Sequence, residues 1–252
     1  MTLQGTNTYL IGTGSGRILL DTGNPNVNEY IDTLKGVLNE HGIRLQQILV
    51  SHWHADHVGG VSNILSDIAP DCTVQKLAFD DDDKSDITFS YLKDGDEIHT
   101  EGASLRVSAT PGHTVDHMIL YLDEEKAVFS GDCILGEGTA VFEDLHSYMG
   151  SLNKILSLKP SVIYPGHGPV IDDPVSKITE YISHRLKREE QILGALKHAS
   201  PDSLTPMQLV KIIYVDTPQH LHAAAARNVE HHLTKLLKDN AVVLQKGLYK
   251  LA

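Results

Sequence analysis

Hydrophobic positions follow two alternating patterns over the first two thirds of the chain. Short aliphatic or β-branched runs that end at turn residues predict strands. They lie at Asn7–Ile11, Arg17–Asp21, Gln47–Ser51, Leu105–Thr110, Met118–Leu122, Lys126–Gly131 and Val162–Tyr164. Helical spacing appears at Val27–His41, from about Gly60 onward, and at Met149–Leu158. Strands interleaved with helices predict a layered α/β domain.

The pattern changes after Asp172-Asp173-Pro174. Amphipathic spacing predicts a long helix at Val175–Ala199, a short one from Thr205-Pro206, and another at Pro218–Asp239. Ala241–Gln245 and Leu248–Leu251 flank Lys246-Gly247, which predicts a small β-hairpin. Helices followed by a hairpin are typical of a winged-helix module. We therefore expect two regions, 1–171 and 172–252.

Composition narrows the class of protein. The 252 residues suffice for a full hydrophobic core, and no apolar run reaches the roughly 18 residues of a membrane span, so no membrane partner is expected. Two cysteines, Cys72 and Cys133, cannot form a disulfide framework, which favours a reducing compartment.

The net charge of −12 argues against generic nucleic-acid binding, and stable DNA binding is not expected. Residues 172–252 hold 11 basic and 9 acidic side chains, a balance of +2, so the balance of −14 lies on the first region.

Histidine is the unusual residue, with 15 in the chain. Four potential metal ligands, His52, His54, Asp56 and His57, stand within six residues directly after an apolar strand. Unrelated polar loop residues would explain one or two of them, but not all four. If the loop begins extended, His52 and His54 point the same way, while Asp56 and His57 can turn toward a second centre.

Three further candidates, His113, Asp132 and His167, also follow apolar strands and adjoin glycine. Alone, each would more often be a turn residue. Together the candidates supply two centres, one with His52, His54 and His113 and one with Asp56, His57 and His167, and Asp132 is the natural bridge. Nitrogen and carboxylate ligands without thiolate suit two Zn²⁺ ions per chain, with Mn²⁺ or Fe²⁺ as alternatives. The chemistry this implies is hydrolysis.

The pattern His52-x-His54-x-Asp56-His57, with His113, Asp132 and His167, resembles the metallo-β-lactamase superfamily. The resemblance implies a four-layer αβ/βα sandwich with a dimetal site at one edge and a C-terminal winged-helix-like appendage. Asp21, in Leu19-Leu20-Asp21-Thr22-Gly23, matches an early aspartate that supports a metal ligand, and a turn-capping role is open beside it.

Two positions separate branches of the superfamily. One branch of β-lactamases carries Cys where Asp132 stands, and flavodiiron proteins carry Glu where His54 stands, so both activities are disfavoured. Glutathione-thioester hydrolases of the glyoxalase II type and phosphodiester nucleases both keep the full ligand set.

Longer segments resemble the animal β-lactamase-like endoribonucleases associated with mitochondria. These segments are Met1–Leu10, Tyr91–Asp96, Phe129–Thr139 and Tyr181–Arg185. The resemblance implies cleavage of single-stranded RNA, two zinc ions and a place in the mitochondrial matrix. No presequence is visible, so the cytoplasm is the alternative, and the resemblance leaves room for a segment ahead of Met1.

The resulting hypothesis is that a hydroxide between the two metals attacks the scissile phosphorus, with Asp56, Asp132 and His184 as the catalytic residues. Asp56 would also orient the water. His184 would donate a proton or contact a phosphate, with Arg185 beside it. An ordinary exposed helix histidine without a functional role is an equally weighted alternative. A glyoxalase II-like thioester hydrolase and a non-catalytic metal-binding module are the competing functions. For His231-His232 we expect solvated helix surface, and for Trp53 packing beside the site.

Overall fold

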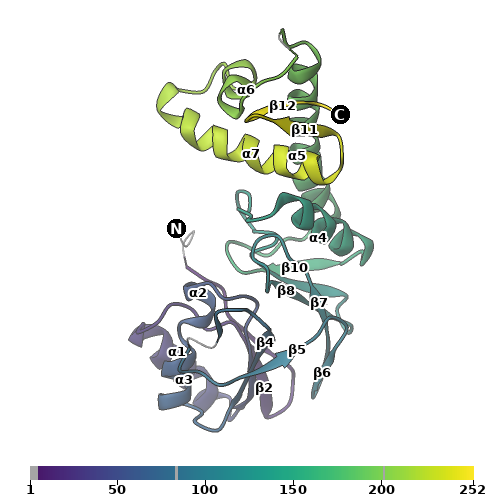
Figure 1. Ribbon diagram of the computed structural model, residues 1–252. Coiled ribbons are helices and arrows are strands. Elements are labelled where there is room, and N and C mark those ends of the chain that lie inside the picture. Colours follow the sequence, from purple (N-terminus) through teal and green to yellow (C-terminus); the bar gives the residue numbers. More distant parts are fainter. Residues whose placement is uncertain (1–4, 83–84, 201) are drawn as a thin grey trace.

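The computed structural model describes residues 5–82, 85–200 and 202–252 and has two parts (Figure 1). The first part contains two five-stranded sheets. One has the order β1-β2-β3-β4-β5 and the other β10-β9-β8-β7-β6. The strands of the first sheet are β1 (Tyr9–Ile11), β2 (Gly16–Leu20), β3 (Arg44–Leu49), β4 (Thr73–Leu77) and β5 (Phe89–Leu92). Those of the second are β6 (Glu97–Thr100), β7 (Ala103–Ala109), β8 (Met118–Leu122), β9 (Ala127–Gly131) and β10 (Val162–Pro165).

Alternation along each strand divides its side chains between two cores. In β2 and β3, Ile18, Leu20 and Leu49 pack into the core between the two sheets. Leu19 and Ile48 point the other way and pack against α1 (Asn28–Glu40) and α3 (Val61–Asp67). A strand buried on both faces needs apolar residues at successive positions, which explains the unbroken aliphatic runs in the sequence.

The second sheet is covered on its outer face by α4 (Leu145–Ser157) and by the first turns of α5 (Pro174–Lys197). The four layers are therefore helix, sheet, sheet and helix, which confirms the αβ/βα sandwich.

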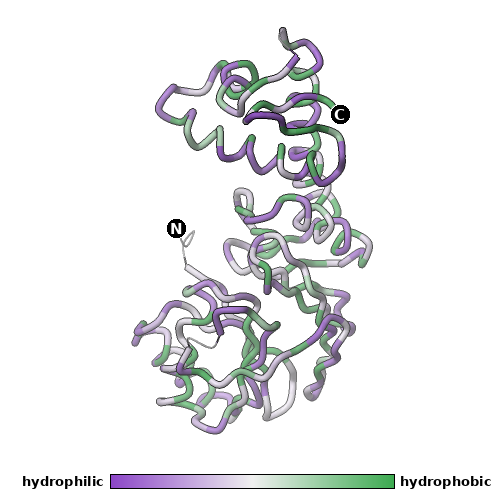
Figure 2. The backbone as a smooth tube through the Cα atoms, in the orientation of Figure 1, coloured by the Kyte–Doolittle hydropathy of each residue, from purple (hydrophilic) through white to green (hydrophobic). Residues whose placement is uncertain are grey.

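The second part contains α6 (Pro206–Ile213), a short 3₁₀ turn at Gln219–Leu221, α7 (His222–Lys238) and the hairpin β11 (Val242–Gln245) with β12 (Leu248–Leu251). Its own core joins the second half of α5 to these elements through residues such as Ile192, Leu209 and Leu233. Hydrophobic and hydrophilic stretches alternate along the backbone in both parts (Figure 2).

α5 belongs to both parts. Ile178 and Tyr181 pack in the core of the second sheet, whereas Ile192 and Leu196 pack in the C-terminal core. The boundary between the two hydrophobic cores therefore lies within α5. The division of the chain into domains between residues 171 and 172 stays a prediction.

Three strands, β4, β5 and β6, were not expected from the sequence. β4 and β6 carry polar residues at most positions, as in Glu97-Ile98-His99-Thr100, where Ile98 alone is in the core. β5 is only four residues long and buries Leu92 alone. The helix α2 (Ala55–Val58) was also missed, because the ligand cluster was expected on a loop. Within the described residues, no helix is both long and apolar enough to cross a membrane.

Candidate metal centre

The seven expected ligands meet where several strands end. His52, His54, Asp56 and His57 follow β3, and His113 follows β7. Asp132 follows β9, and His167 follows the parallel strand β10. Because these strands end at the same edge of the sandwich, residues far apart in sequence come together there. The structure places all seven in two groups, and within each group the ligand atoms lie within 4.8 Å of one another.

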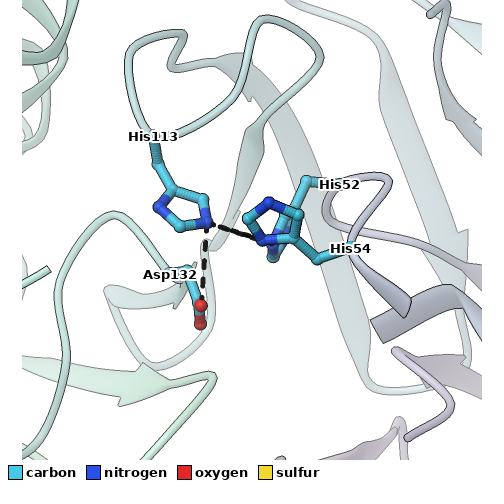
Figure 3. Close-up of side chains that lie close together, drawn as sticks. All are labelled: His52, His54, His113 and Asp132. Carbon is cyan, nitrogen blue, oxygen red and sulfur yellow. Dashed lines mark hydrogen bonds and ion pairs between the residues drawn. The ribbon is translucent and has the colours of Figure 1, made fainter. Parts of the chain in front are cut away.

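The first group contains His52, His54, His113 and Asp132 (Figure 3). The Nδ1 atom of His54 lies 3.0 Å from Nε2 of His52 and 3.1 Å from Nε2 of His113. The two Nε2 atoms lie 3.3 Å apart. Three ring nitrogens therefore converge on one point.

The second group contains Asp56, His57 and His167. Oδ2 of Asp56 lies 3.2 Å from Nε2 of His167 and 3.6 Å from Nε2 of His57. Asp56 is in the first turn of α2, and its Oδ2 accepts a hydrogen bond from the Thr6 hydroxyl at 3.1 Å. The helix thus turns Asp56 and His57 away from His52 and His54, as the spacing predicted.

Asp132 reaches both groups. Its Oδ1 lies 3.4 Å from Nε2 of His57 and 3.4 Å from Nε2 of His167. Its Oδ2 lies 3.7 Å from Nε2 of His113. The carboxylate therefore lies between the two groups, where the sequence had placed a bridging ligand.

Hydrogen bonds on the far side of three rings select the nitrogen that faces the site. Nδ1 of His57 donates to Oδ2 of Asp21 at 2.8 Å. Nδ1 of His113 donates to the carbonyl of Val141, and Nδ1 of His167 to that of Gly5, both at 2.8 Å. A ring that donates through Nδ1 presents Nε2 to a cation.

Asp21 holds several of these groups at once. Its Oδ1 accepts the backbone N–H of Ser51 at 2.7 Å, and its Oδ2 accepts the Ser51 hydroxyl at 2.8 Å. The same hydroxyl lies 3.0 Å from Nδ1 of His52. Asp21 has a left-handed backbone with φ of 60°, a strained conformation that places its carboxylate under His57.

The histidines of the two groups differ in charge. Burial lowers the pKa of His52 and of His113, so both are neutral ligands. For His57, burial opposes the charge but Asp21 and Asp132 outweigh it and raise its pKa to about 10. For His167, burial is likewise outweighed by Asp132 and Asp56, which raise its pKa to about 10. The hydrogen bond with His167 lowers the pKa of Asp56 to about 2.

These donors fit divalent cations. Nε2 of His57 and Oδ1 of Asp132 are buried and make no hydrogen bond among the described residues, although they lie within 3.4 Å of each other. Ring nitrogens that face one another repel each other or compete with the buried carboxylate for protons. A divalent cation between them can be bound by all of these ligand atoms at once. Nitrogen and oxygen donors are the ligands that zinc and related metals take.

His117 was missed at the sequence level. Its ring is fully buried, its Nδ1 donates to the Thr110 hydroxyl at 2.8 Å, and its Nε2 accepts the backbone N–H of Asp132 at 3.1 Å. It thereby fixes the backbone of the bridging carboxylate. It stands directly before β8 and has no neighbouring glycine, so the signal that marked His113, Asp132 and His167 was absent.

The structure places His184 and Arg185 on α5, outside both ligand groups. His184 is exposed, whereas Arg185 is buried and donates to the carbonyls of Tyr181 and Ala140. Trp53 is 37% exposed and stacks on Phe79, with 5.5 Å between the ring centroids, which agrees with packing beside the site.

The expectation for His231-His232 was wrong in part. His232 is 2% exposed, and its Nδ1 lies 3.7 Å from Glu189. His231 is half-buried against the ring of Phe142. The helix packs against α4 and α5, and the sequence did not reveal which face of it would be covered.

Both parts of the chain match known protein families. Residues 1–70 and 79–167 match the metallo-beta-lactamase superfamily, and residues 205–248 match the beta-lactamase associated winged helix domain. A crystal structure of the metallo-beta-lactamase family protein TTHA1429 from Thermus thermophilus is similar in fold. Its TM-score is 0.72 at 22% identity, covering 98% of this chain and 94% of that one.

Relatives are more similar in sequence. The "Beta-lactamase-like protein 2 homolog" of Caenorhabditis elegans is 51% identical and covers 96% of this chain and 81% of the relative. That of Drosophila melanogaster is 50% identical and covers 98% and 87%. "Thioesterase pkgB" of Emericella nidulans is 44% identical over 78% of this chain and 55% of its own length. The chain therefore belongs to the metallo-beta-lactamase superfamily of metal-dependent hydrolases and carries that family's C-terminal winged-helix domain.

Proposed function

We propose that this protein is a metal-dependent endoribonuclease that hydrolyses phosphodiester bonds in single-stranded RNA. The observation that carries the hydrolytic part is the position of Asp132 between two groups of converging ligands. The choice of RNA is supported by the segments that resemble animal β-lactamase-like endoribonucleases, among them Phe129–Thr139, which contains Asp132.

The residues that would hold the cations are the two groups already described, with Asp132 shared. Two divalent cations, which we propose to be zinc, supply an activated water nucleophile and neutralise charge on the phosphodiester oxygens. His52 and His113 offer neutral nitrogens at neutral pH, because burial lowers the pKa of each ring.

Asp56 is the residue we assign to orient the attacking water. Its pKa of about 2 keeps the carboxylate ionised at neutral pH, and the Thr6 hydroxyl holds one of its oxygens. An ionised, positioned carboxylate accepts a hydrogen bond from water and sets its direction of attack. Asp132, whose pKa is lowered by His167 and His57 against the effect of burial, stays ionised in the same way.

Water as the nucleophile has a consequence for the products. The 2′-hydroxyl of the ribose takes no part in bond breaking, so a 2′,3′-cyclic phosphate does not form. Residues 1–171 carry a net charge of −14, which repels the RNA backbone. Binding of RNA is therefore expected to be short-range and weak in the absence of the cations. We propose the mitochondrial matrix as the compartment.

Thioester hydrolysis is the second candidate. It is favoured by the relative named as a thioesterase, which is 44% identical over 196 residues. The same ligands would serve it, since water attack on a thioester carbonyl also develops an oxyanion.

A panel of defined substrates separates the two. The zinc-loaded full chain is incubated with a uridine-rich RNA oligomer, the matching DNA oligomer, S-lactoylglutathione and an acyl-pantetheine thioester. The proposal predicts cleavage of the RNA with no cyclic phosphate ends, and loss of cleavage in Asp56→Asn. Asp67→Asn, a change at a surface carboxylate paired with Lys35, is the matched control and keeps full activity. Thioester turnover without RNA cleavage contradicts the proposal.

A further inference from the structure

A pocket of about 430 Å³ lies where the C-terminal part meets the metal-binding part. One wall is the loop that contains residues 139–142, which connects β9 to α4. The other walls are α5, through His184 and Arg185, and α7, through Arg227 and His231. None of its lining residues belongs to either ligand group.

The lining is unusual for so acidic a chain. It contains two arginines, three histidines and Asn228, and no aspartate or glutamate is among the described residues that line it. The chain as a whole carries a net charge of −12. A concave site that is lined by positively charged side chains and lacks carboxylates attracts an anion.

Arg185 adds an independent observation. It is 4% exposed, its Nε makes no hydrogen bond among the described residues, and no described carboxylate lies within 4.0 Å of its guanidinium. Its two hydrogen bonds, to the carbonyls of Tyr181 and Ala140, are both 3.3 Å long. Its guanidinium lies 4.9 Å, 5.6 Å and 5.8 Å from the ring centroids of Tyr181, Tyr148 and Phe142, and these rings offset part of the cost of burying the charge. The rings supply no counter-charge, and a bound anion would reduce the remaining cost.

The surroundings of His184 agree with a positive field. Burial and then Arg185, Arg188 and His232 lower its pKa, and Glu180 acts in the opposite sense. Glu189, the acidic residue beside His232, is engaged by Lys235, whose Nζ lies 3.0 Å from its Oε2.

The pocket is connected to the metal centre by two successive carbonyl groups. The carbonyl of Val141 accepts from Nδ1 of the ligand His113 at 2.8 Å. The carbonyl of the preceding residue, Ala140, accepts from Arg185. One short loop therefore contacts both the ligand His113 and the pocket residue Arg185.

We propose that this pocket binds a phosphate group of the RNA strand other than the one that is cleaved. Arg227, His231 and His184 contact the phosphate oxygens, and Arg185 supplies a buried positive charge beneath them. This inference rests on the proposed function, since it assigns the bound phosphate to RNA. It would fix the register of the strand across the metal centre, because backbone contacts position a nucleic acid without reading its sequence.

The first test measures binding without turnover. The zinc-loaded full chain is titrated with inorganic phosphate while its amide NMR signals are followed. We expect saturable shifts at His184, Arg227 and His231, and their loss in Arg227→Gln. Arg106→Gln removes the same charge from an exposed arginine paired with Asp123 and keeps the shifts. Shifts that are absent, or unchanged in Arg227→Gln, overturn the proposal.

The second test identifies the source of the phosphate. For RNA cleavage by Arg227→Gln, we expect KM to rise about tenfold, the effect of one charge-assisted hydrogen bond, while kcat changes less. The slope of log KM against log salt should fall by about 0.7, as for one lost contact to a single strand. An altered fold alone would not move that slope, and Arg106→Gln keeps both values. An unchanged KM and slope in Arg227→Gln overturn the assignment.

The two arms separate the failure of this inference from that of the proposed function. If phosphate binds at α7 but RNA is not cleaved, the proposed function and the RNA source are overturned, and the phosphate site stands. If RNA is cleaved but Arg227→Gln behaves like the wild type in both tests, the function stands and the pocket proposal is wrong.

Discussion

The first and second ligand groups, called here the two halves of the metal centre, contain histidines in different protonation states. His52 and His113 have pKa values lowered by burial, so they present lone pairs. His57 and His167 lie against carboxylates that outweigh the effect of burial and raise their pKa values to about 10. A cation that binds His52 and His113 displaces no proton from these two rings, whereas one that binds His57 and His167 must displace protons that Asp21, Asp56 and Asp132 hold in place. Neighbouring carboxylates, rather than the histidines themselves, create this difference.

Removing the shared carboxylate should have the largest effect, because it belongs to both halves. Asp132→Asn is expected to lower the hydrolytic rate by more than about a hundredfold, the upper range for partners that act only through a ligand. Metal content by mass spectrometry and the cleavage rate are measured together. Retention of two zinc ions and full activity would show that Asp132 is not a ligand shared by the two metals.

Asp21→Asn should affect one half more than the other. Asp21 contacts His57 directly at 2.8 Å and reaches His52 only through the Ser51 hydroxyl. We expect zinc affinity of the second group to fall about 10- to 100-fold, with a smaller loss in the first. Calorimetric titration resolves the two binding steps. Equal weakening of both steps would contradict the distinction between the halves.

The difference in charge predicts a pH dependence of stability in the metal-free chain. His57 and His167 have pKa values of about 10 in the folded state and 6.5 in their ordinary range. The stability that they contribute is therefore fully present below pH 6.5 and is lost as the pH rises toward 10. The Tm should fall by several degrees over this range, since about 1 kcal/mol changes Tm by about 2–4 °C in a chain of this size.

Zinc provides the control for that measurement. With cations bound, His57 and His167 have already lost their protons, so the same pH change should leave Tm nearly constant. A metal-free Tm that is flat or rises between pH 6.5 and 9.5 would show that the carboxylates do not hold these protons.

His184 should give the smallest effect. It is exposed and outside both ligand groups, and it contacts substrate only if the strand reaches α5. His184→Gln is expected to raise KM for RNA about two- to fivefold, a loss of less than about 1 kcal/mol, without altering zinc content. A loss as large as that of Asp132→Asn would make His184 part of the reaction itself, as the sequence hypothesis allowed.

The candidate ligands could be selected from the sequence because each one is a local feature. A histidine or aspartate beside glycine at the end of an apolar strand is visible without any knowledge of packing, and parallel strand ends meet at one edge. The strands β4 and β6 were missed because polar residues occupy most of their positions, so alternation is hidden. β5 was missed because it is only four residues long and buries Leu92 alone.

Contacts between distant elements could not be predicted. The local sequence indicates neither the hydrogen bond that His117 accepts from the backbone N–H of Asp132 nor the burial of His232. The same holds for the pocket, in which α5, α7 and the loop at residues 139–142 meet only in three dimensions.

Hydrolysis is expected to require a cation in both halves of the metal centre. This requirement is measured as the rate of RNA oligomer cleavage while zinc is added stepwise to the metal-free full chain. We expect little cleavage up to one zinc ion per chain and a rise that ends at two. A rate that reaches its plateau at one zinc ion, or no RNA cleavage with two bound, would contradict this expectation.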